Sequence, residues 1–446
     1  MKIFSSLTSQ LETITDKKIS IYVCGVTPYT ECHLGHAMSA MIYDSLIRFL
    51  RWRGNEVIYV SNYTDIDDKI IDAAKAANVD PIQLAKNNIE EWEQQQEVLG
   101  LEKPNIRPKV TEEIETIIIA IEKIIENGYA YVTEDGGVYY SVRKNKKYGE
   151  LSHRKIDELQ KEERENDDSK GEKIESLDFA LWKPKKTGEP GWSSPWGEGR
   201  PGWHIECSAM SEKYLGENFS IHGGGTDLIF PHHENEIAQS CCANKTENFA
   251  NYWLHNGFVT FDKEKMSKSI GNIVTINKLR ENVNGQVVRL ALLSSHYKQP
   301  LDWNKKLLNQ QKNTLDKWYS LYEEKFDAQQ NPECFDCLLD DLNTPEYISK
   351  LHELYNGAVK GDKKMKETFN NACRLIGIFS ENKQNWEKYK KKSVKVSEDF
   401  IINKINERLR ARKSGDYKLA DKIRDDLLKE GVLIEDKKDK TDWKYK

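Results

Sequence analysis

Two short motifs in this chain carry residue types that handle phosphates. His33 and His36 are three positions apart with Gly35 between them, so at a helix start both imidazoles would face an anion at the helix N-terminus. Far downstream, Lys265 and Lys268 belong to the run Lys-Met-Ser-Lys-Ser. Two ammonium groups on a movable loop can neutralise the charge that develops on a leaving pyrophosphate. The ordered pair of motifs predicts activation of a substrate by ATP.

Each motif also has an ordinary structural explanation when it is taken alone. Histidine pairs are common in proteins, and a lysine-rich turn is usually a solvated surface feature. The combination of the two motifs in one chain favours the phosphate interpretation over both alternatives.

Four further residues are of types that bind metals: Cys24, Cys207, His232 and Glu236. His232 and Glu236 are four positions apart on a predicted helix, so both face one side, and the cysteines are expected near strand ends that could converge on them. Two thiolates, one imidazole and one carboxylate suit zinc. Single cysteines are more often small buried hydrophobes, and His233 is a rival of His232, so the spacing alone leaves both alternatives open.

The elements around the first motif form a β-α-β pattern. Residues 19–23 are a β-branched run, residues 36–53 have a helical pattern that ends at Gly54, and residues 57–60 are predicted to be the next strand. Ligands of parallel sheets collect at the carboxyl ends of the strands, where the loop after Val23 lies.

A second unit of the same kind follows a long insertion. It is predicted to consist of a strand at 219–222, a tight turn at Gly223–Gly225 and a helix that begins at Pro231. Within the insertion, residues 154–173 carry 6 basic and 8 acidic residues and are expected to be exposed and mobile, and residues 184–202 are expected to form an irregular loop.

Composition and charge limit the class of protein. With 446 residues the chain is too long for one core, and no apolar stretch approaches the roughly 20 residues that cross a bilayer. The eight cysteines are spread without a compact framework, so a cytoplasmic location is expected. The net charge is −5, but residues 381–446 carry 20 Lys and Arg against 14 Asp and Glu. A basic tail on an acidic body suits contact with a polyanion, or is simply a solvated helical face.

The motifs resemble those of a known family. His-Leu-Gly-His with Lys-Met-Ser-Lys-Ser resembles the signature pair of class I aminoacyl-tRNA synthetases, and four longer segments are similar to the cysteinyl-tRNA synthetase family: residues 22–28, 63–69, 202–210 and 222–236. Similar segments continue to Trp443, so the resemblance covers almost the whole chain.

The resemblance implies roles for individual residues. It implies that Cys24, Cys207, His232 and Glu236 are the ligands of one Zn²⁺, and it favours His232 over His233. Thr64 and Trp203 resemble residues of the amino-acid pocket. The implied ATP-binding residues are His33, Gly35, His36, Gly224, Thr226, Asp227 and Lys268, and the implied catalytic residues are His33, His36, Lys265 and Lys268.

The implied reaction is the ATP-dependent charging of tRNA(Cys). The carboxylate of L-cysteine attacks the α-phosphate of ATP with Mg²⁺ assisting, and the adenylate is passed to the 3′ end of the tRNA. Direct binding of the thiol by zinc would discriminate cysteine from serine by about 10⁴-fold or more, so no editing domain is expected. The protein is expected to be a monomer with no membrane contact.

The implied architecture is α/β, with a Rossmann-like parallel-sheet catalytic domain that an insertion splits, a helical bundle and a small C-terminal anticodon-binding domain. The expected boundaries are 1–115 and 201–305 for the catalytic halves, 116–200 for the insertion, 306–380 for the bundle and 381–446 for the last domain.

Two alternatives share most of these motifs. A cysteine ligase of the mycothiol-pathway type makes the same adenylate but transfers cysteine to an amino-sugar, and a non-catalytic RNA-binding paralogue would make none. The long basic tail favours tRNA over an amino-sugar, and the retention of the phosphate-handling residues argues against the second alternative. The C-terminus departs from the family pattern at Lys440 and Asp442, and Leu342 replaces a usual Phe.

Overall fold

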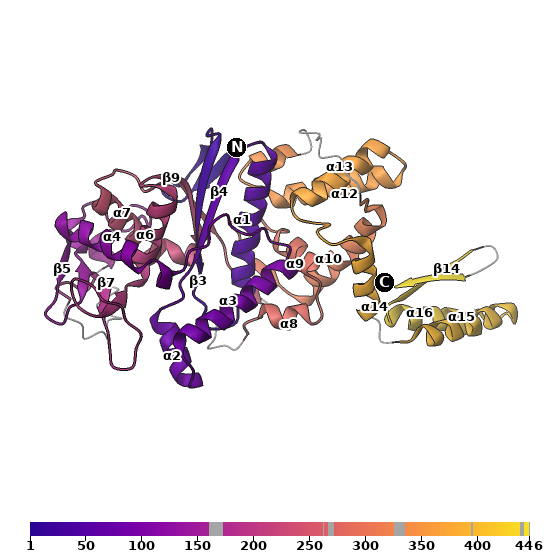
Figure 1. The fold of residues 1–446 in the computed structure, drawn as a ribbon. Helices are drawn as coiled ribbons and strands as arrows, with labels where there is room; N and C mark the ends of the chain where they lie inside the picture. The colour runs from indigo at the N-terminus through magenta and orange to yellow at the C-terminus, as the bar shows by residue number, and fades with distance from the viewer. Residues whose placement is uncertain are drawn as a thin grey trace. The chain divides into compact units, whose positions relative to one another are not determined.

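The computed structural model describes residues 1–159, 173–261, 263–265, 272–324, 335–393, 396–437 and 441–445 (Figure 1). Most of the charged segment 154–173 and part of the Lys-Met-Ser-Lys-Ser run lie outside the described residues. The chain divides into two compact units. The first consists of Met1–Lys278, Leu292–Trp303 and Pro332–Ile348, and the second of Leu279–Ala291, Asn304–Asn331 and Ser349–Lys446. The five predicted domain segments stay predictions.

A four-stranded parallel sheet is the centre of the first unit. Its order is β10-β9-β3-β4, in which β3 (Lys18–Val26) lies between β4 (Glu56–Tyr63) and β9 (Phe219–Gly225), and β10 (Ala250–Asn256) pairs with β9. The apolar residues of β3 are buried as a near-continuous run, which is typical of a parallel strand covered on both faces. The α/β class with a parallel sheet is confirmed.

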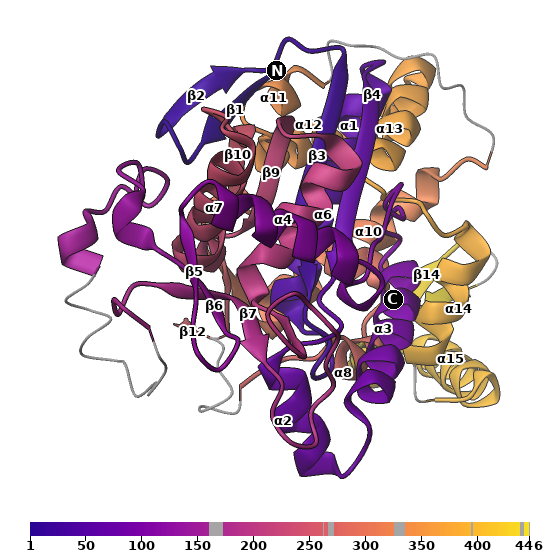
Figure 2. The ribbon, with the colours of Figure 1, turned by 60° about the vertical axis from the view of Figure 1, so that its left-hand side comes forward.

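Helices cover this sheet. α1 (Leu34–Trp52) connects β3 to β4, and α4 (Ile114–Glu126), α6 (Trp203–Leu215) and α7 (Glu234–Asn244) lie together in front of the sheet in Figure 2. In α4 the buried isoleucines recur at helical spacing, which gives the helix one apolar face toward the core. Burial of that face, rather than helix propensity, holds α4 in place.

The first unit has further helices and two smaller sheets and a hairpin around the parallel sheet. Two further helices follow β4, α2 (Asp68–Ala77) and α3 (Pro81–Val98). The insertion forms an antiparallel sheet of β5 (Ala130–Val132), β6 (Val138–Tyr140), β7 (Phe179–Pro184) and β8 (Gly199–Pro201). A hairpin of β1 (Lys2–Ser5) and β2 (Gln10–Thr13) begins the chain, and β11 (Val259–Phe261) pairs with β12 (Glu264–Lys265) and β13 (Leu301–Trp303).

The second unit is helical with a terminal hairpin. Its helices include α10 (Lys305–Trp318), α13 (Lys363–Leu375), α14 (Lys383–Ser393), α15 (Glu398–Lys413) and α16 (Tyr417–Lys429). The hairpin of β14 (Val432–Asp436) and β15 (Thr441–Tyr445) shares a small apolar core with α15 and α16. None of the described helices is long and apolar enough to span a membrane.

Two local predictions are wrong. Gly223–Gly225 form no turn but continue β9, because Gly223 pairs with both Val23 and Leu254 and leaves no room for a side chain beside the Tyr43 ring. The prediction that helical backbone begins at Pro231 is confirmed, because within the π-helical turn Ile229–His233 only Phe230 is extended, with φ −135° and ψ 133°, and the turn continues directly into α7.

The second wrong prediction concerns Cys207. It lies within helix α6 and not at a strand end. Residues 203–215 do not show the strict alternation of apolar and polar residues that is typical of a strand.

Candidate functional site

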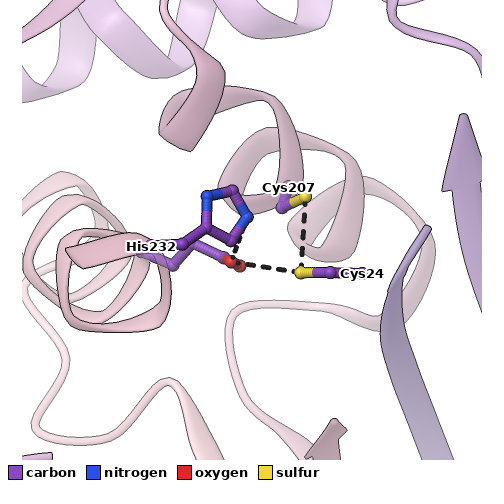
Figure 3. A group of neighbouring side chains, drawn as sticks. Cys24, Cys207 and His232 are labelled. Atoms are coloured by element: carbon purple, nitrogen blue, oxygen red, sulfur yellow. Dashed lines mark hydrogen bonds and ion pairs between the residues drawn. The ribbon is translucent and has the colours of Figure 1, made fainter. Parts of the chain in front are cut away.

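The four residues proposed as zinc ligands lie together in the structure. Cys24 comes from β3, Cys207 from α6, His232 from the π-helical turn Ile229–His233 and Glu236 from the first turn of α7. One ligand atom from each lies within 4.8 Å of the others. Figure 3 shows the two sulfur atoms and the imidazole of His232 turned toward one another. Segments far apart in sequence therefore build one metal-type group.

The distances within the group are short. The Cys24 thiol lies 3.6 Å from the sulfur of Cys207 and 3.3 Å from Oε1 of Glu236. The Nε2 atom of His232 is 3.0 Å from the same Oε1 atom. Cys207, His232 and Glu236 are buried, so bulk water screens the charges of these three side chains only weakly.

The group holds charge despite its burial. Burial opposes ionisation of Glu236, yet His222 and His232 hold the pKa of its carboxyl well below the usual value. Burial likewise opposes the imidazolium form of His232, but Glu236 and Cys207 raise its pKa to about 10. The hydrogen bond from the Cys24 thiol lowers the pKa of Cys207 to about 6, whereas burial raises that of Cys24. A thiolate at Cys207 is the form that binds a metal.

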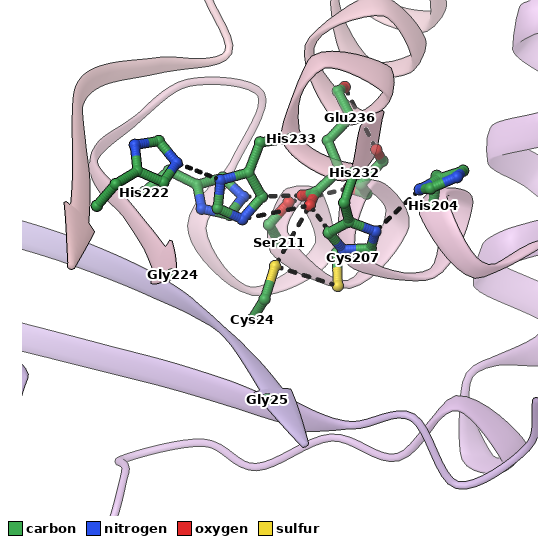
Figure 4. Close-up of polar contacts among 12 residues, drawn as sticks. Cys24, Gly25, His204, Cys207, Ser211, His222, Gly224, His232, His233 and Glu236 are labelled. Carbon is green, nitrogen blue, oxygen red and sulfur yellow. Dashed lines mark hydrogen bonds and ion pairs between the residues drawn. The ribbon is translucent and has the colours of Figure 1, made fainter. Parts of the chain in front are cut away.

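Further histidines surround these four residues (Figure 4). Nδ1 of His204 lies 2.9 Å from Nδ1 of His232, and Nε2 of His222 lies 2.8 Å from Oε2 of Glu236. Such outer contacts fix the orientation of metal ligands. His222 and His233 also form an alternative metal-type group with Cys24 and Glu236.

His33 and His36 begin helix α1, as predicted. His33 is the N-cap residue, and its Nδ1 accepts a hydrogen bond from the Gly35 N–H at 3.1 Å, while Nδ1 of His36 accepts from the His33 N–H at 3.1 Å. Since both Nδ1 atoms accept, each neutral ring carries its proton on Nε2. The rings stack with centroids 3.9 Å apart. Burial, with His33 adding to it, lowers the pKa of His36 to about 3, so this ring is neutral.

The chain after the second motif returns to the first. His33 pairs with Thr275 in an antiparallel bridge, and the Leu34 N–H donates to the carbonyl of Val274 at 3.1 Å. Lys265 ends β12, and Lys268 lies outside the described residues. The segment that follows the lysine motif is thus held at the N-terminus of α1.

A cavity of about 470 Å³ joins the two sites. Its lining includes Cys24 of the metal-type group together with His33, Gly35 and His36. Trp203, Thr226 and Asp227 also line it. Gly224 lies behind this wall in β9, where a Cβ atom would meet the imidazole of His233. Thr64 follows β4, is buried and is not one of the lining residues. Its hydroxyl donates a hydrogen bond to Glu206 at 3.1 Å.

Comparisons with known proteins identify the family of the chain. Residues 10–313 match the family described as tRNA synthetases class I (C), catalytic domain. The chain is 50% identical to a cysteine–tRNA ligase of Pelagibacter ubique over 437 residues, covering 97% of this chain and 96% of the relative. It is 43% identical to a cysteine–tRNA ligase of Thermodesulfovibrio yellowstonii over the full length of both chains. The chain belongs to the class I cysteine–tRNA ligase family.

The fold agrees with this class I family. A methionyl-tRNA synthetase of Mycobacterium tuberculosis, solved in complex with methionyl-adenylate, superimposes with a TM-score of 0.58 over 81% of this chain and 90% of that one. The two sequences are 15% identical, so the likeness concerns the fold alone.

Several residues of this candidate site were not predicted from the sequence. Lys69, Tyr29 and Asn62 line the cavity, and His204 and His222 contact the metal-type group. Lys69 and His222 belong to the segments 63–69 and 222–236, which resemble the family. No spacing in the sequence indicated which of their side chains turn inward.

Proposed function

We propose that this chain charges tRNA(Cys) with L-cysteine in two steps, formation of cysteinyl-adenylate from ATP and transfer of cysteine to the 3′ end of the tRNA. The observation that carries the proposal is the shared cavity, because its lining includes Cys24 of the metal-type group in one part and the paired histidines in another. A substrate that spans the cavity can present a thiol to the first and a phosphate to the second. Family membership supports the same reaction.

Selection of cysteine is assigned to Cys24, Cys207, His232 and Glu236. Two sulfur atoms, one imidazole nitrogen and one carboxylate oxygen within 4.8 Å of one another suit Zn²⁺ as ligands. The contact of His204 with Nδ1 of His232 leaves Nε2 of that ring for the metal. Zinc bound there would favour the thiol of cysteine over the hydroxyl of serine. An apolar pocket could discriminate between these two amino acids by only about 10- to 200-fold.

The phosphates of ATP are assigned to His33, His36, Lys265 and Lys268, with Mg²⁺ accompanying the nucleotide. The protons on Nε2 of His33 and His36 make both rings hydrogen-bond donors at a helix N-terminus, where anions are favoured. Neutral donors stabilise the charge that builds on the α-phosphate as the cysteine carboxylate attacks it. The two lysines would neutralise the leaving pyrophosphate.

The rest of the cavity positions the two substrates. Thr226 and Asp227 line the wall beyond Gly224, where adenosine would lie, and Gly35 leaves room for a flat base beside the His33 ring. Trp203 stands beside the metal-type group with its ring centroid 4.2 Å from that of His232, on the side assigned to cysteine. Thr64, held by Glu206, supports that side from behind.

We assign tRNA as the acceptor of the cysteinyl group because the C-terminal part of the chain is basic. The excess of Lys and Arg over Asp and Glu in residues 381–446 suits the phosphate backbone of RNA. We assign this part to the anticodon end. The monomeric state and the cytoplasmic location stay predictions.

The test is incubation of the zinc-loaded protein with ATP and Mg²⁺ and with either cysteine or serine. Pyrophosphate exchange and acylation of matched tRNA are both followed. Cysteine-dependent exchange with acylation supports the proposal. Exchange without acylation of any tRNA would point to an amino-sugar acceptor instead, and no exchange with either amino acid would overturn the proposal.

A further inference from the structure

A cation in the cavity has no role in the mechanism given above. Lys69 is the second residue of α2, and its side chain lines the cavity. Its ammonium lies 5.8 Å from the ring centroid of Trp203 and 5.7 Å from that of Tyr29. Within the described part of the chain it forms an ion pair with no carboxylate. Lys69 is an exposed residue, and the two aromatic faces favour a positive charge at the wall of the cavity.

The acidic neighbours of Lys69 in sequence are engaged elsewhere. Asp67 is the N-cap of α2, and its Oδ1 accepts from the Lys69 N–H at 2.9 Å. The carboxylate of Asp68 forms ion pairs with Lys183 and with the buried Arg200. These contacts fix the first turn of α2 and leave the Lys69 ammonium for another anion.

The position of Lys69 selects which anion. Trp203, over which the ammonium lies, contacts His232 of the metal-type group, and Cys24 of that group lines the same cavity. A cysteine whose thiol lies at this group carries its carboxylate only a short side chain away. The phosphate-handling histidines form a different part of the wall, at the start of α1.

We propose that Lys69 binds the α-carboxylate of the substrate cysteine. The inference rests on the proposed function and adds a second point of recognition to it. The metal-type group recognises the thiol, and Lys69 recognises the carboxylate and holds it for attack on ATP. A thiol compound without a carboxylate would satisfy only the first contact.

The test measures binding of cysteine and of cysteamine, which lacks the carboxylate, by titration calorimetry with zinc-loaded protein. A charge-assisted contact of this kind is worth about tenfold or more in affinity, so K69M should weaken cysteine binding by about that factor. Cysteamine binding should stay within about twofold, because cysteamine offers Lys69 no anion. K69R keeps the cation and should retain most of the cysteine affinity.

A lysine on the same helix provides the control. Lys75 pairs with Glu189 at 3.4 Å and does not line the cavity, so K75M should bind cysteine as the wild type does. Equal weakening of cysteine and cysteamine by K69M would show a merely structural role and overturn the inference. Unchanged cysteine affinity with a raised KM for ATP would also overturn it, in favour of a phosphate contact.

Failure of the proposed function itself gives a different result. Wild-type protein that supports no cysteine-dependent pyrophosphate exchange would contradict the proposed function before any variant is compared. Wild-type exchange combined with unchanged cysteine affinity of K69M would contradict the role of Lys69 alone.

Discussion

Nε2 of His232 lies 3.0 Å from Oε1 of Glu236, with both side chains buried. A buried carboxylate is costly unless it is paired, and here imidazoles contact both of its oxygens while the Cys24 thiol contacts one of them. The ligands therefore need little rearrangement to surround a cation. Such preorganisation is what a site requires if it is to discriminate a sulfur from an oxygen ligand.

Replacement of a thiol should reduce both metal content and selectivity. Cys207→Ser substitutes a hydroxyl, which zinc binds far less well than a thiolate. We expect the zinc content, measured by elemental analysis, to fall well below one equivalent and the affinity for cysteine to fall by about 100-fold or more. Cys241→Ser is the matched control, because Cys241 belongs to neither metal-type group. Full zinc occupancy in Cys207→Ser would contradict the assignment.

Loss of one histidine of the first motif should slow activation without weakening cysteine binding. His36→Ala removes an Nε2–H donor from the cavity, and loss of one such donor costs roughly 100- to 1,000-fold in rate. The measurement is kcat for pyrophosphate exchange beside the calorimetric Kd for cysteine. His153→Asn changes an exposed histidine at φ 55°, a conformation that Asn tolerates, and should leave both values unchanged. An equal loss of rate in both variants would contradict the prediction.

A methyl group on Gly25 should damage the metal-type group. A Cβ atom there would overlap the backbone carbonyl of Asn62 on β4, so the end of β3 that carries Cys24 would have to move. We expect Gly25→Ala to lose zinc and exchange activity. Gly188→Ala is the comparison, because its Cβ would meet nothing and its φ of 82° costs only about 1–2 kcal/mol of local strain. Normal zinc content in Gly25→Ala would show that the strands can separate there.

The terminal hairpin should lose stability at acid pH. Arg408 donates two hydrogen bonds to Asp436 at 2.7 and 2.8 Å, and these bonds hold the pKa of Asp436 well below its usual 3.8. Because the folded-state pKa is depressed, the stabilisation is complete above about pH 4 and is lost as the pH falls through the folded value. Because Asp436 is partly exposed to water, this contribution to the free energy of unfolding is limited to about 1 kcal/mol.

Asp436→Asn tests this directly. The variant should be less stable than the wild type to denaturant at pH 7, and the difference should shrink as the pH falls below 4. A difference that stays constant between pH 7 and pH 3 would show that the carboxylate charge contributes nothing.

The sequence predicts much of the site because some of its contacts are local. The three-residue spacing of His33 and His36 fixes their common face at the helix start, where the structure has them. The parallel pairing of β3 with β4 follows from the β-branched runs on either side of α1. Both predictions needed only patterns within one short segment.

Features that depend on tertiary neighbours could not be predicted in the same way. The three consecutive glycines at 223–225 are typical of a turn. In the structure Gly223 pairs with strands on both sides, and the Tyr43 ring occupies the space where a side chain would lie. In the sequence Lys69 looks like an ordinary surface lysine. Its proposed role in carboxylate binding rests on the position of Trp203 of α6 beside its ammonium, which the sequence does not show. Residue types and spacing made the convergence of Cys24, Cys207 and His232 one of several alternatives, and the family resemblance selected it.

The most direct test of the account is the ratio of kcat/KM for cysteine to that for serine in pyrophosphate exchange by the zinc-loaded protein. If the group of Cys24, Cys207, His232 and Glu236 selects the amino acid through its thiol, the ratio should reach about 10⁴ or more. A ratio of about 100, such as an apolar pocket gives, would contradict that central claim.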